Sequence, residues 1–268
     1  AFNDALSRDP SWAKADKVQK ELVIVRRLAD AAGPIRKRPS IFPSRMEKFD
    51  DPEKLIRQFL LKDYEPEKKL LTKTTAVSAL GSCFAGHIAQ RLNERGVSVF
   101  YKQIGEDINN TFANKYLLEW IEHGPRCALT NELEAIYGTE QRNEFRERFS
   151  ATRVFIFTLG VAPAFFDRKT GEFMLAHGGA SENKLLPEIA EFRTTTVAEN
   201  LANLRAIVDS ARRLSGGAKF VITVSPVPLA ATYEMGSAIV ADCLSKSTLR
   251  LTVDEYLKDA RDFAYYWP

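Results

Sequence analysis

The chain of 268 residues is poor in cysteine and histidine, with three residues of each. Its cysteines are widely spaced and form neither a CxxC pair nor an even disulfide framework. Free thiols in a reducing compartment, the cytoplasm, are therefore predicted. Neither residue type is clustered as metal ligands are, so no metal site and no cofactor are expected.

Long hydrophobic runs and an excess of one charge are also missing. No segment reaches the length of a membrane-spanning helix, and no signal-peptide pattern opens the sequence. The 38 basic and 35 acidic residues nearly balance, and a solvated linker explains the few clustered bases of Arg36–Arg45. We therefore expect neither a membrane nor a nucleic acid as partner. A hydrophobic content of 45% is enough for one large core.

The sequence pattern divides the chain into two parts. Residues 1–70 are predicted to be a helical extension followed by a proline-rich linker, and 71–268 an α/β domain. Within the second part, strands alternate with helices, which favours a parallel sheet covered on both faces, a three-layer α/β fold. The strands are expected at Ala76–Leu80, Val97–Tyr101, Val154–Leu159, Lys219–Val224 and Phe263–Trp267, with a hairpin in Phe165–Glu182.

The stretch Thr74–Phe100 carries the most informative turn. A short apolar strand ends at Gly81-Ser82-Cys83, and apolar residues at helical spacing follow. Side chains at the carboxyl end of a strand in an open α/β sheet face the ligand crevice. A thiol or hydroxyl placed there also sits at a helix N-terminus, where amide groups and the helix dipole favour an anion.

Several short strings match one known family. The string Gly81–Ala85, GSCFA, resembles the motif after which the GSCFA-domain family is named. Further matches are Thr158–Gly160, Ser225–Pro228 and Ser245–Arg250, so the resemblance runs from about Thr74 to the end of the chain. This family is similar to the SGNH hydrolases. The resemblance therefore implies a flavodoxin-like, three-layer α/β fold of the SGNH hydrolase type.

The identity of the nucleophile stays open at this point. The resemblance places Cys83 where SGNH hydrolases carry their catalytic serine, but Ser82 stands directly before it. A cysteine at a strand–helix turn can also be a small core residue without any chemical role.

The resemblance also implies groups that bind an oxyanion or the substrate. Asn110 and Thr111 precede a predicted helix, and either can supply such donors or simply cap that helix. Gly160 can present a backbone amide or form an ordinary turn. Ser225 is expected to turn a loop, and Lys246 can meet an anionic substrate or remain a structural cation.

A general base is harder to place. Among the histidines, His177 lies in a glycine-rich loop and is the one most able to reach the site, whereas His87 and His123 lie on predicted helices. The resemblance implies instead a D-x-x-H motif after the strand that ends near Pro268, and this sequence contains none. We therefore expect a piece of a longer protein that lacks its catalytic histidine.

Three functions remain at this stage. The first is an acyl-ester hydrolase or O-acyltransferase that uses Cys83 or Ser82 on an acylated carbohydrate or another small ester, and this substrate class rests on the resemblance. The second is a non-catalytic carbohydrate-binding or scaffold module on the same fold. The third is a phosphate or nucleotide binder, although the turn has neither the lysine of a P-loop nor a G-x-G-x-x-G motif. The oligomeric state stays open.

Overall fold

A computed structural model describes Phe42, Tyr64, Pro66 and residues 51–62, 68–102, 104–105, 109–175 and 186–268. The helix and most of the linker predicted in residues 1–50 lie outside these residues, as does His177. The chain divides into two compact units, Ala1–Leu55 and Ile56–Pro268. In the first unit the described helix is α3 (Pro52–Leu55).

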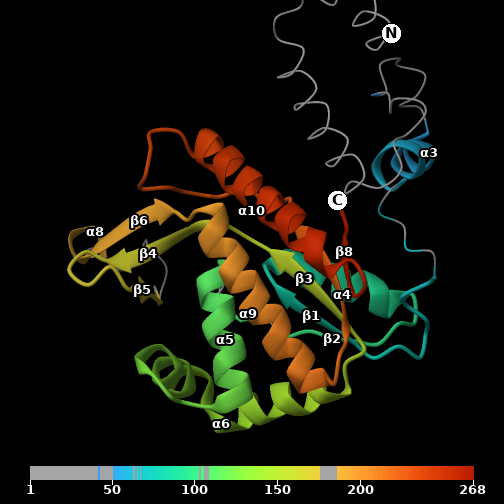
Figure 1. The fold of residues 1–268 in the computed structure, drawn as a ribbon, viewed down its shortest axis with the longest axis horizontal. Helices are drawn as coiled ribbons and strands as arrows, with labels where there is room; N and C mark the ends of the chain where they lie inside the picture. Colours follow the sequence, from blue (N-terminus) through green and yellow to red (C-terminus); the bar gives the residue numbers. More distant parts are fainter. Residues whose placement is uncertain are drawn as a thin grey trace, which may run out of the picture. The chain divides into compact units, whose positions relative to one another are not determined.

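The second unit alternates strands and helices along the chain (Figure 1). A short π-helix, η2 (Ile56–Leu60), opens it. The elements that follow in the described residues are β1 (Val77–Gly81), α4 (Cys83–Glu94), β2 (Val99–Phe100), α5 (Thr111–His123), α6 (Ala128–Ala151), β3 (Val154–Leu159), β4 (Pro163–Asp167), β5 (Phe173–Met174), α8 (Leu186–Ile189), β6 (Ala190–Thr194), α9 (Val197–Ser215), β7 (Lys219–Val224), α10 (Ala238–Ala260) and β8 (Ala264–Tyr266).

The main sheet has five strands, and every neighbouring pair in it is parallel. Their spatial order is β2-β1-β3-β7-β8, which is the flavodoxin-like order 2-1-3-4-5. All six residues of the central strand β3 are buried. Burial along the whole length is typical of a strand that is covered on both faces, whereas alternating burial is typical of a strand with one face in solvent. The predicted parallel sheet is confirmed.

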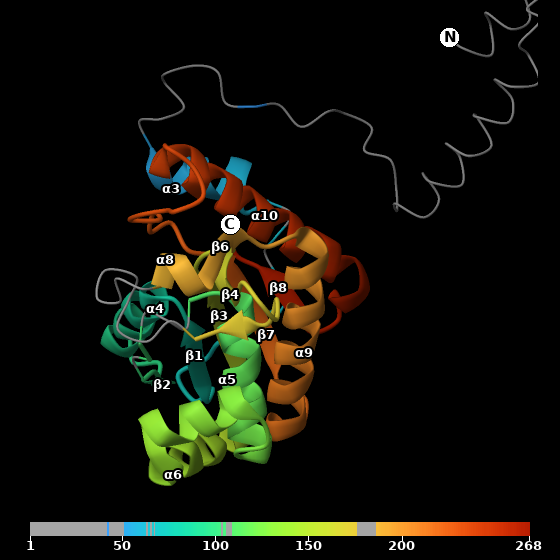
Figure 2. The same ribbon diagram turned by 90° about the vertical axis from the view of Figure 1, so that its left-hand side faces the viewer.

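Helices cover both faces of this sheet. Helix α4 packs on β1, β2 and β3, whereas α10 packs on β7 and β8 and also against α9, which in turn packs on α5. Figure 2 shows α4 and α9 on opposite sides of the strands. Successive strand residues point to opposite faces. Accordingly Ile156 belongs to the cluster under α4, while Phe155 and Phe157 belong to the larger cluster on the other face. The predicted three-layer α/β fold is confirmed.

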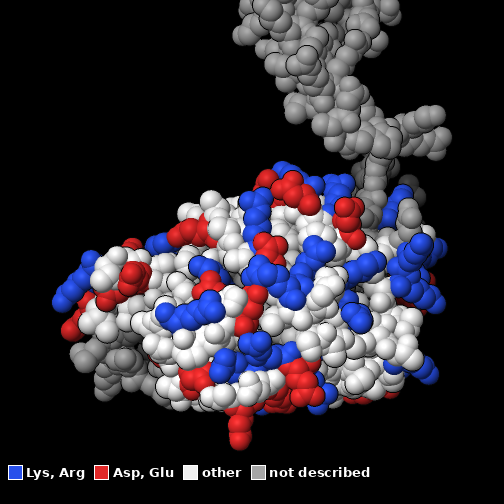
Figure 3. Space-filling view, turned by 60° about the horizontal axis from the view of Figure 1, so that its bottom comes forward, with Lys and Arg blue, Asp and Glu red and all other residues white. Residues whose placement is uncertain are grey.

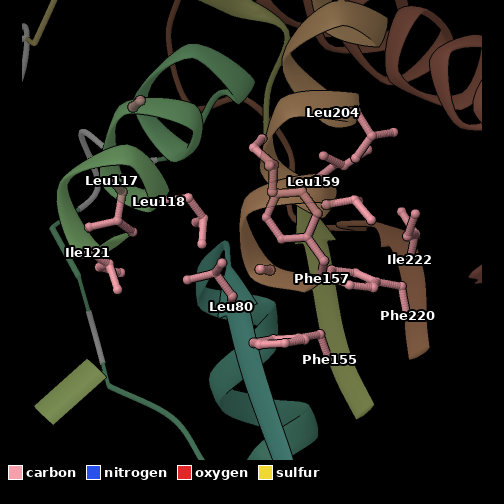
Figure 4. Packing of buried hydrophobic residues seen from close by; sticks show 14 of the residues in the cluster. Leu80, Leu117, Leu118, Ile121, Phe155, Phe157, Leu159, Leu204, Phe220 and Ile222 are labelled. Atoms are coloured by element: carbon pink, nitrogen blue, oxygen red, sulfur yellow. The ribbon is translucent and has the colours of Figure 1, made fainter. Parts of the chain in front are cut away.

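The larger cluster is the main core of the domain. Figure 4 shows Leu117, Leu118 and Ile121 of α5 beside Leu80 of β1, with the phenylalanines of β3 and β7 on the other side of Leu80. Leu204 of α9 belongs to the same cluster. The rings of Phe155 and Phe220 stack with centroids 5.1 Å apart across neighbouring strands. This packing fixes α5 and α9 against the sheet, and it therefore fixes the N-terminus of α5 beside the carboxyl ends of the strands.

The predicted hairpin is part of a larger antiparallel sheet. Strands β4 and β5 pair as expected, but β6 adds a third strand, in the order β5-β4-β6. The sequence did not suggest β6, because Ala190 is the only fully buried residue among its five. Its pairing depends on a contact distant in the sequence, in which the Phe165 and Phe192 rings lie 4.8 Å apart.

The surface carries mixed charge. On the face in Figure 3, Lys and Arg side chains lie among Asp and Glu side chains. Arg213 donates to the Glu122 carboxylate, with Nε 2.7 Å from Oε1, and this ion pair links α9 to α5. The Arg213 hydrogen bond is the main reason that the pKa of Glu122 is lowered.

Candidate functional site

The candidate site lies at the carboxyl edge of the parallel sheet. The register pairs Gly81 of β1 with Thr158 of β3, and Leu159 of β3 with Val224 of β7. The residues that follow these three strands therefore meet at one edge, where parallel α/β sheets bind their ligands. Cys83, Gly160 and Ser225 share this edge, as their positions after predicted strands indicated.

The turn after β1 packs tightly against β3. Gly81 has φ +111°, and a Cβ atom on it would lie 2.1 Å from the Thr158 carbonyl oxygen. Only glycine fits this conformation and this close approach. Ser82 is the N-cap residue of α4, and its N–H donates to the same carbonyl oxygen at 3.0 Å. The Ser82 hydroxyl is also engaged, since its Oγ lies 2.8 Å from Thr158 Oγ1, and Ser82 is only 3% exposed.

Cys83 occupies the first position of α4. In contrast to Ser82, it is exposed, and its thiol is free. A core cysteine would be buried. The two nucleophile candidates thus differ in environment: the serine hydroxyl is buried in a hydrogen bond to β3, and the thiol faces the edge at the N-terminus of a helix.

Gly160 brings a second loop against this turn. A Cβ atom on it would lie 2.7 Å from the Asn109 carbonyl oxygen and 3.3 Å from Ser82 Cβ. The Val161 N–H donates to the same Asn109 carbonyl at 3.2 Å. The lack of a side chain at Gly160 therefore allows the loop before α5, the end of β3 and the turn of β1 to meet.

Helix α10 supplies a cation at this junction. Lys246 Nζ donates to the Gly160 carbonyl oxygen at 2.6 Å, and its side chain is 19% exposed. Burial lowers the pKa of the Lys246 ammonium, and the negative charges of Asp242 and of a Cys83 thiolate partly oppose this shift. Lys246 is thus close enough to Cys83 for their charges to interact.

The same helix holds two loops of the edge in place. Asp242, one turn before Lys246, lies 3.9 Å from its Nζ and accepts a hydrogen bond from the Leu229 N–H at 2.7 Å. The buried Ser245 hydroxyl accepts from the Ala162 N–H at 2.9 Å. These contacts fasten the loop after β7 and the loop after β3 to α10.

Asn110 and Thr111, which the resemblance implied as substrate-binding residues, have other partners in the structure. Asn110 is the N-cap of α5, and its Oδ1 accepts from the Ala113 N–H at 2.9 Å. The buried Thr111 hydroxyl donates to Asn200 Oδ1 at 2.7 Å and accepts from Asn203 Nδ2 at 3.2 Å. The Thr111 side chain therefore joins α5 to α9 inside the protein.

Ser225 also has a local role. Its N–H donates to the Leu159 carbonyl oxygen at 2.8 Å, and its Oγ accepts from the Val227 N–H at 3.2 Å. Only 2% of the residue is exposed. The hydroxyl thus turns the proline-containing loop after β7, as the sequence predicted.

The histidines differ in their distance from this edge. His87 is on α4, one turn beyond Cys83. His123 ends the thirteen-residue helix α5, whose start lies at the Gly160 loop; a helix of that length spans about 20 Å, which places His123 far from Cys83. The third candidate, His177, lies outside the described residues.

Tyr101 is a site residue that the sequence alone did not suggest. It directly follows β2, the neighbour of β1, so it lies at the same carboxyl edge. A Cβ atom on Gly86 would lie 2.8 Å from Tyr101 Cε1, so the ring rests against the first turns of α4. Two signals were present in the sequence: its position at the end of a predicted strand, and a glycine three residues after Cys83.

A groove runs along α4 on the side of the helix that faces away from Tyr101. Its volume is about 740 Å³, and apolar residues of α4, β3, β7 and β8 line most of it, together with described residues of 61–71. Phe84, next to Cys83, lies at one end of the helix face that lines the groove, and Arg95 lies at the other. The groove therefore begins beside the candidate nucleophile.

Two features are absent from the described residues. Within those ranges, no group of three or more His, Cys, Asp or Glu side chains is arranged to hold a metal ion. In the same part of the chain, no helix has the length and hydropathy needed to cross a membrane.

The sequence model of the GSCFA family matches residues 130–268, just over half of the chain. The matched range contains Gly160, Ser225 and Lys246 and begins after the string Gly81–Ala85. No curated protein matches the chain.

Proposed function

Because the chain belongs to the GSCFA family, we propose that it is an acyl-ester hydrolase or O-acyltransferase whose nucleophile is Cys83. The observation that carries this proposal is the exposed thiol at the first position of α4, at the carboxyl edge of a parallel sheet. Amide groups and the dipole at a helix N-terminus favour the reactive thiolate. The Lys246 side chain lies at the same junction, where its Nζ donates to the Gly160 carbonyl oxygen.

The environment of Ser82 supports the choice of the thiol. Attack by Ser82 would require its hydroxyl to leave the hydrogen bond with Thr158 and to reach a substrate from a position that is 3% exposed. Cys83 needs neither change. Cysteine is also more nucleophilic than serine near neutral pH, because a few per cent of an ordinary thiol is already ionised.

The proposed reaction proceeds in two steps. The Cys83 thiolate attacks the ester carbonyl carbon, a C–S bond forms, and the carbonyl electron pair moves onto oxygen. Loss of the alcohol leaves an acyl-thioester, and water or a sugar hydroxyl then takes the acyl group. Donors for the oxyanion would come from the first-turn amides of α4 and from the Gly160 loop, which lies within contact distance of Ser82.

The substrate, the base and the compartment are proposed on other grounds. An acylated carbohydrate is proposed from the resemblance to SGNH hydrolases, which is an inference from the fold. His177 stays one candidate for the base on sequence grounds, and the resemblance implies instead the histidine of a D-x-x-H motif, which this sequence does not contain. A cytoplasmic location is proposed because all three cysteines are free thiols.

Acylation of the protein by p-nitrophenyl acetate tests the proposal. A single-turnover reaction followed by mass spectrometry should place the acetyl group on Cys83. Cys83→Ala should lower the rate of p-nitrophenol release by at least about 10²-fold, since loss of a nucleophile removes most of the catalysis. Cys243→Ala, which removes another exposed thiol, is the matched control and should leave the rate unchanged.

Ser82→Ala separates the two nucleophile candidates. Because it removes a buried hydrogen bond to Thr158, it should lower the unfolding free energy by about 1 kcal/mol while the acetyl group still reaches Cys83. If Ser82→Ala silences a folded protein and Cys83→Ala does not, the serine is the nucleophile. If neither change affects p-nitrophenol release, the chain does not use this turn for catalysis, and a carbohydrate-binding module becomes the better explanation.

A further inference from the structure

Tyr101 places a hydroxyl group at the edge of the sheet where the candidate nucleophile also lies. The side chain is only partly buried, and its hydroxyl is not one of the buried polar atoms without a partner, so it reaches solvent. No hydrogen bond joins it to another described residue. A donor that reaches solvent at this edge is open to a ligand.

The ring of Tyr101 is held in place by α4. A Cβ atom on Gly86 would lie 2.8 Å from the ring and 3.1 Å from the hydroxyl oxygen. Gly86 is three residues after Cys83 in the same helix, so both residues lie on one face of it. The absence of a side chain at Gly86 therefore lets the phenol lie close to the helix turn that carries the thiol.

The electrostatic environment keeps this hydroxyl protonated. Burial raises the pKa of Tyr101 above its ordinary value of 10.0, and the negative charge of a nearby Cys83 thiolate raises it further. A phenol in this state is a neutral hydrogen-bond donor throughout the pH range in which a thiolate attacks esters. No hydrogen bond joins Tyr101 and Cys83 directly in the structure.

Tyr101 and the Gly160 loop follow the two strands that flank the strand of Cys83. Strand β1 lies between β2 and β3, so Tyr101 follows the neighbouring strand on one side and the Gly160 loop follows the neighbouring strand on the other. A donor placed at a developing oxyanion stabilises it, and the Tyr101 hydroxyl is a donor at this edge.

We propose that the Tyr101 hydroxyl is a catalytic residue that donates a hydrogen bond to the acyl oxygen of the ester while Cys83 attacks. This inference rests on the proposed function. The C–S bond forms, the carbonyl electron pair moves onto oxygen, and the tyrosine keeps its proton while stabilising that charge. When the ester C–O bond breaks, the electron pair reforms the carbonyl group, and the departing alkoxide takes a proton from water.

Tyr101→Phe removes only the hydroxyl and is the main test. Loss of one oxyanion donor typically lowers kcat by about 10²–10³-fold. The variant should therefore acetylate Cys83 at least about 10-fold more slowly with p-nitrophenyl acetate, while KM stays within about twofold, because the missing interaction belongs to the transition state. Tyr265→Phe is the matched control and should react at the parent rate, because Tyr265 lies on β8, which is the outermost strand on the side of the sheet opposite to β2.

Alkylation of Cys83 by iodoacetamide separates this role from an effect on the thiol. Displacement of iodide develops no oxyanion, so Tyr101→Phe should alkylate at the parent rate. Gly86→Ala keeps the hydroxyl but forces the ring to move, and it should slow acetylation in the same way without changing alkylation.

Each result of these experiments supports or overturns the role of Tyr101. Acetylation of Tyr101→Phe at the parent rate, in a protein that Cys83→Ala silences, overturns the role of Tyr101 and leaves the proposed function standing. Equal losses in acetylation and alkylation overturn it as well, because Tyr101 would then act on the thiol or on the fold. If Cys83→Ala stays fully active, the proposed function fails, and the role of Tyr101 fails with it.

Discussion

Gly81→Ala tests the tightest contact at the candidate site. A Cβ atom at this position would lie 2.1 Å from the Thr158 carbonyl oxygen and 2.9 Å from its carbon. Both atoms belong to the backbone of β3, so no side chain can rotate away to make room. The Gly81 φ of +111° adds strain of its own for any residue with a side chain.

The expected cost has two parts. A backbone conformation open only to glycine costs about 1–3 kcal/mol, and overpacking that forces a backbone shift costs a further ~1–3 kcal/mol. We expect about 4 kcal/mol in all, a large part of the ~5–15 kcal/mol by which domains are usually stable. A loss of that size lowers the Tm of a domain of this length by about 8–16 °C.

Gly216→Ala is the matched control. Gly216 also has a positive φ, +68°, but an added Cβ atom there would meet nothing within 4 Å. This change should cost only the conformational strain, about 1–2 kcal/mol. Urea denaturation followed by circular dichroism measures both variants. If Gly81→Ala costs no more than Gly216→Ala, the turn does not pack against β3 as described here.

Two further predictions concern charge. With limiting iodoacetamide near neutral pH, Cys83 should be alkylated before the other cysteines. Cys83 and Cys127 both lie at a helix N-terminus, but only Cys83 also has the Lys246 ammonium nearby. Preferential labelling of another cysteine in the mass spectrum would contradict this prediction. Hydrogen bonds from Arg193 hold the pKa of Glu199 at about 2, below its ordinary 4.5, so the ionised carboxylate stabilises the fold above pH 4.5 and loses this effect as the pH falls toward 2. Glu199→Gln should therefore lower the unfolding free energy by about 1 kcal/mol at pH 7, a value reduced because the side chain is partly exposed to solvent. The difference from the parent protein should vanish near pH 2, and a difference that grows with acid would refute the assignment.

Much of the fold could be predicted from local patterns. The strands Val154–Leu159 and Lys219–Val224 have the bounds that their apolar runs predicted. The helix after Gly81-Ser82-Cys83 begins at the expected turn, and the sequence T-x-x-E at Thr196 forms a capping box with Glu199. These features depend on residues within a few positions of one another, and burial on both faces leaves a strand with a continuous apolar run.

The third strand of the small sheet and the kink in α6 could not be predicted in this way. β6 has one fully buried residue and exists because it pairs with β4. Gly138, with φ +76° and ψ +162°, breaks the helical geometry inside α6. Both depend on contacts with distant parts of the chain or on a single backbone conformation.

The candidate site shows the same division. The sequence by itself placed Cys83, Gly160 and Ser225 after buried strands, and the rule that parallel strands end at one edge brought them together. Only the tertiary structure decided that the Ser82 hydroxyl is bound to Thr158 while the Cys83 thiol is exposed, and that Tyr101 lies over the same helix turn. The spacing of apolar residues along the sequence indicates which residues are buried. The hydrogen-bond partner of a hydroxyl, however, depends on how strands and helices that are far apart in the sequence pack together, and no local sequence pattern determines this packing.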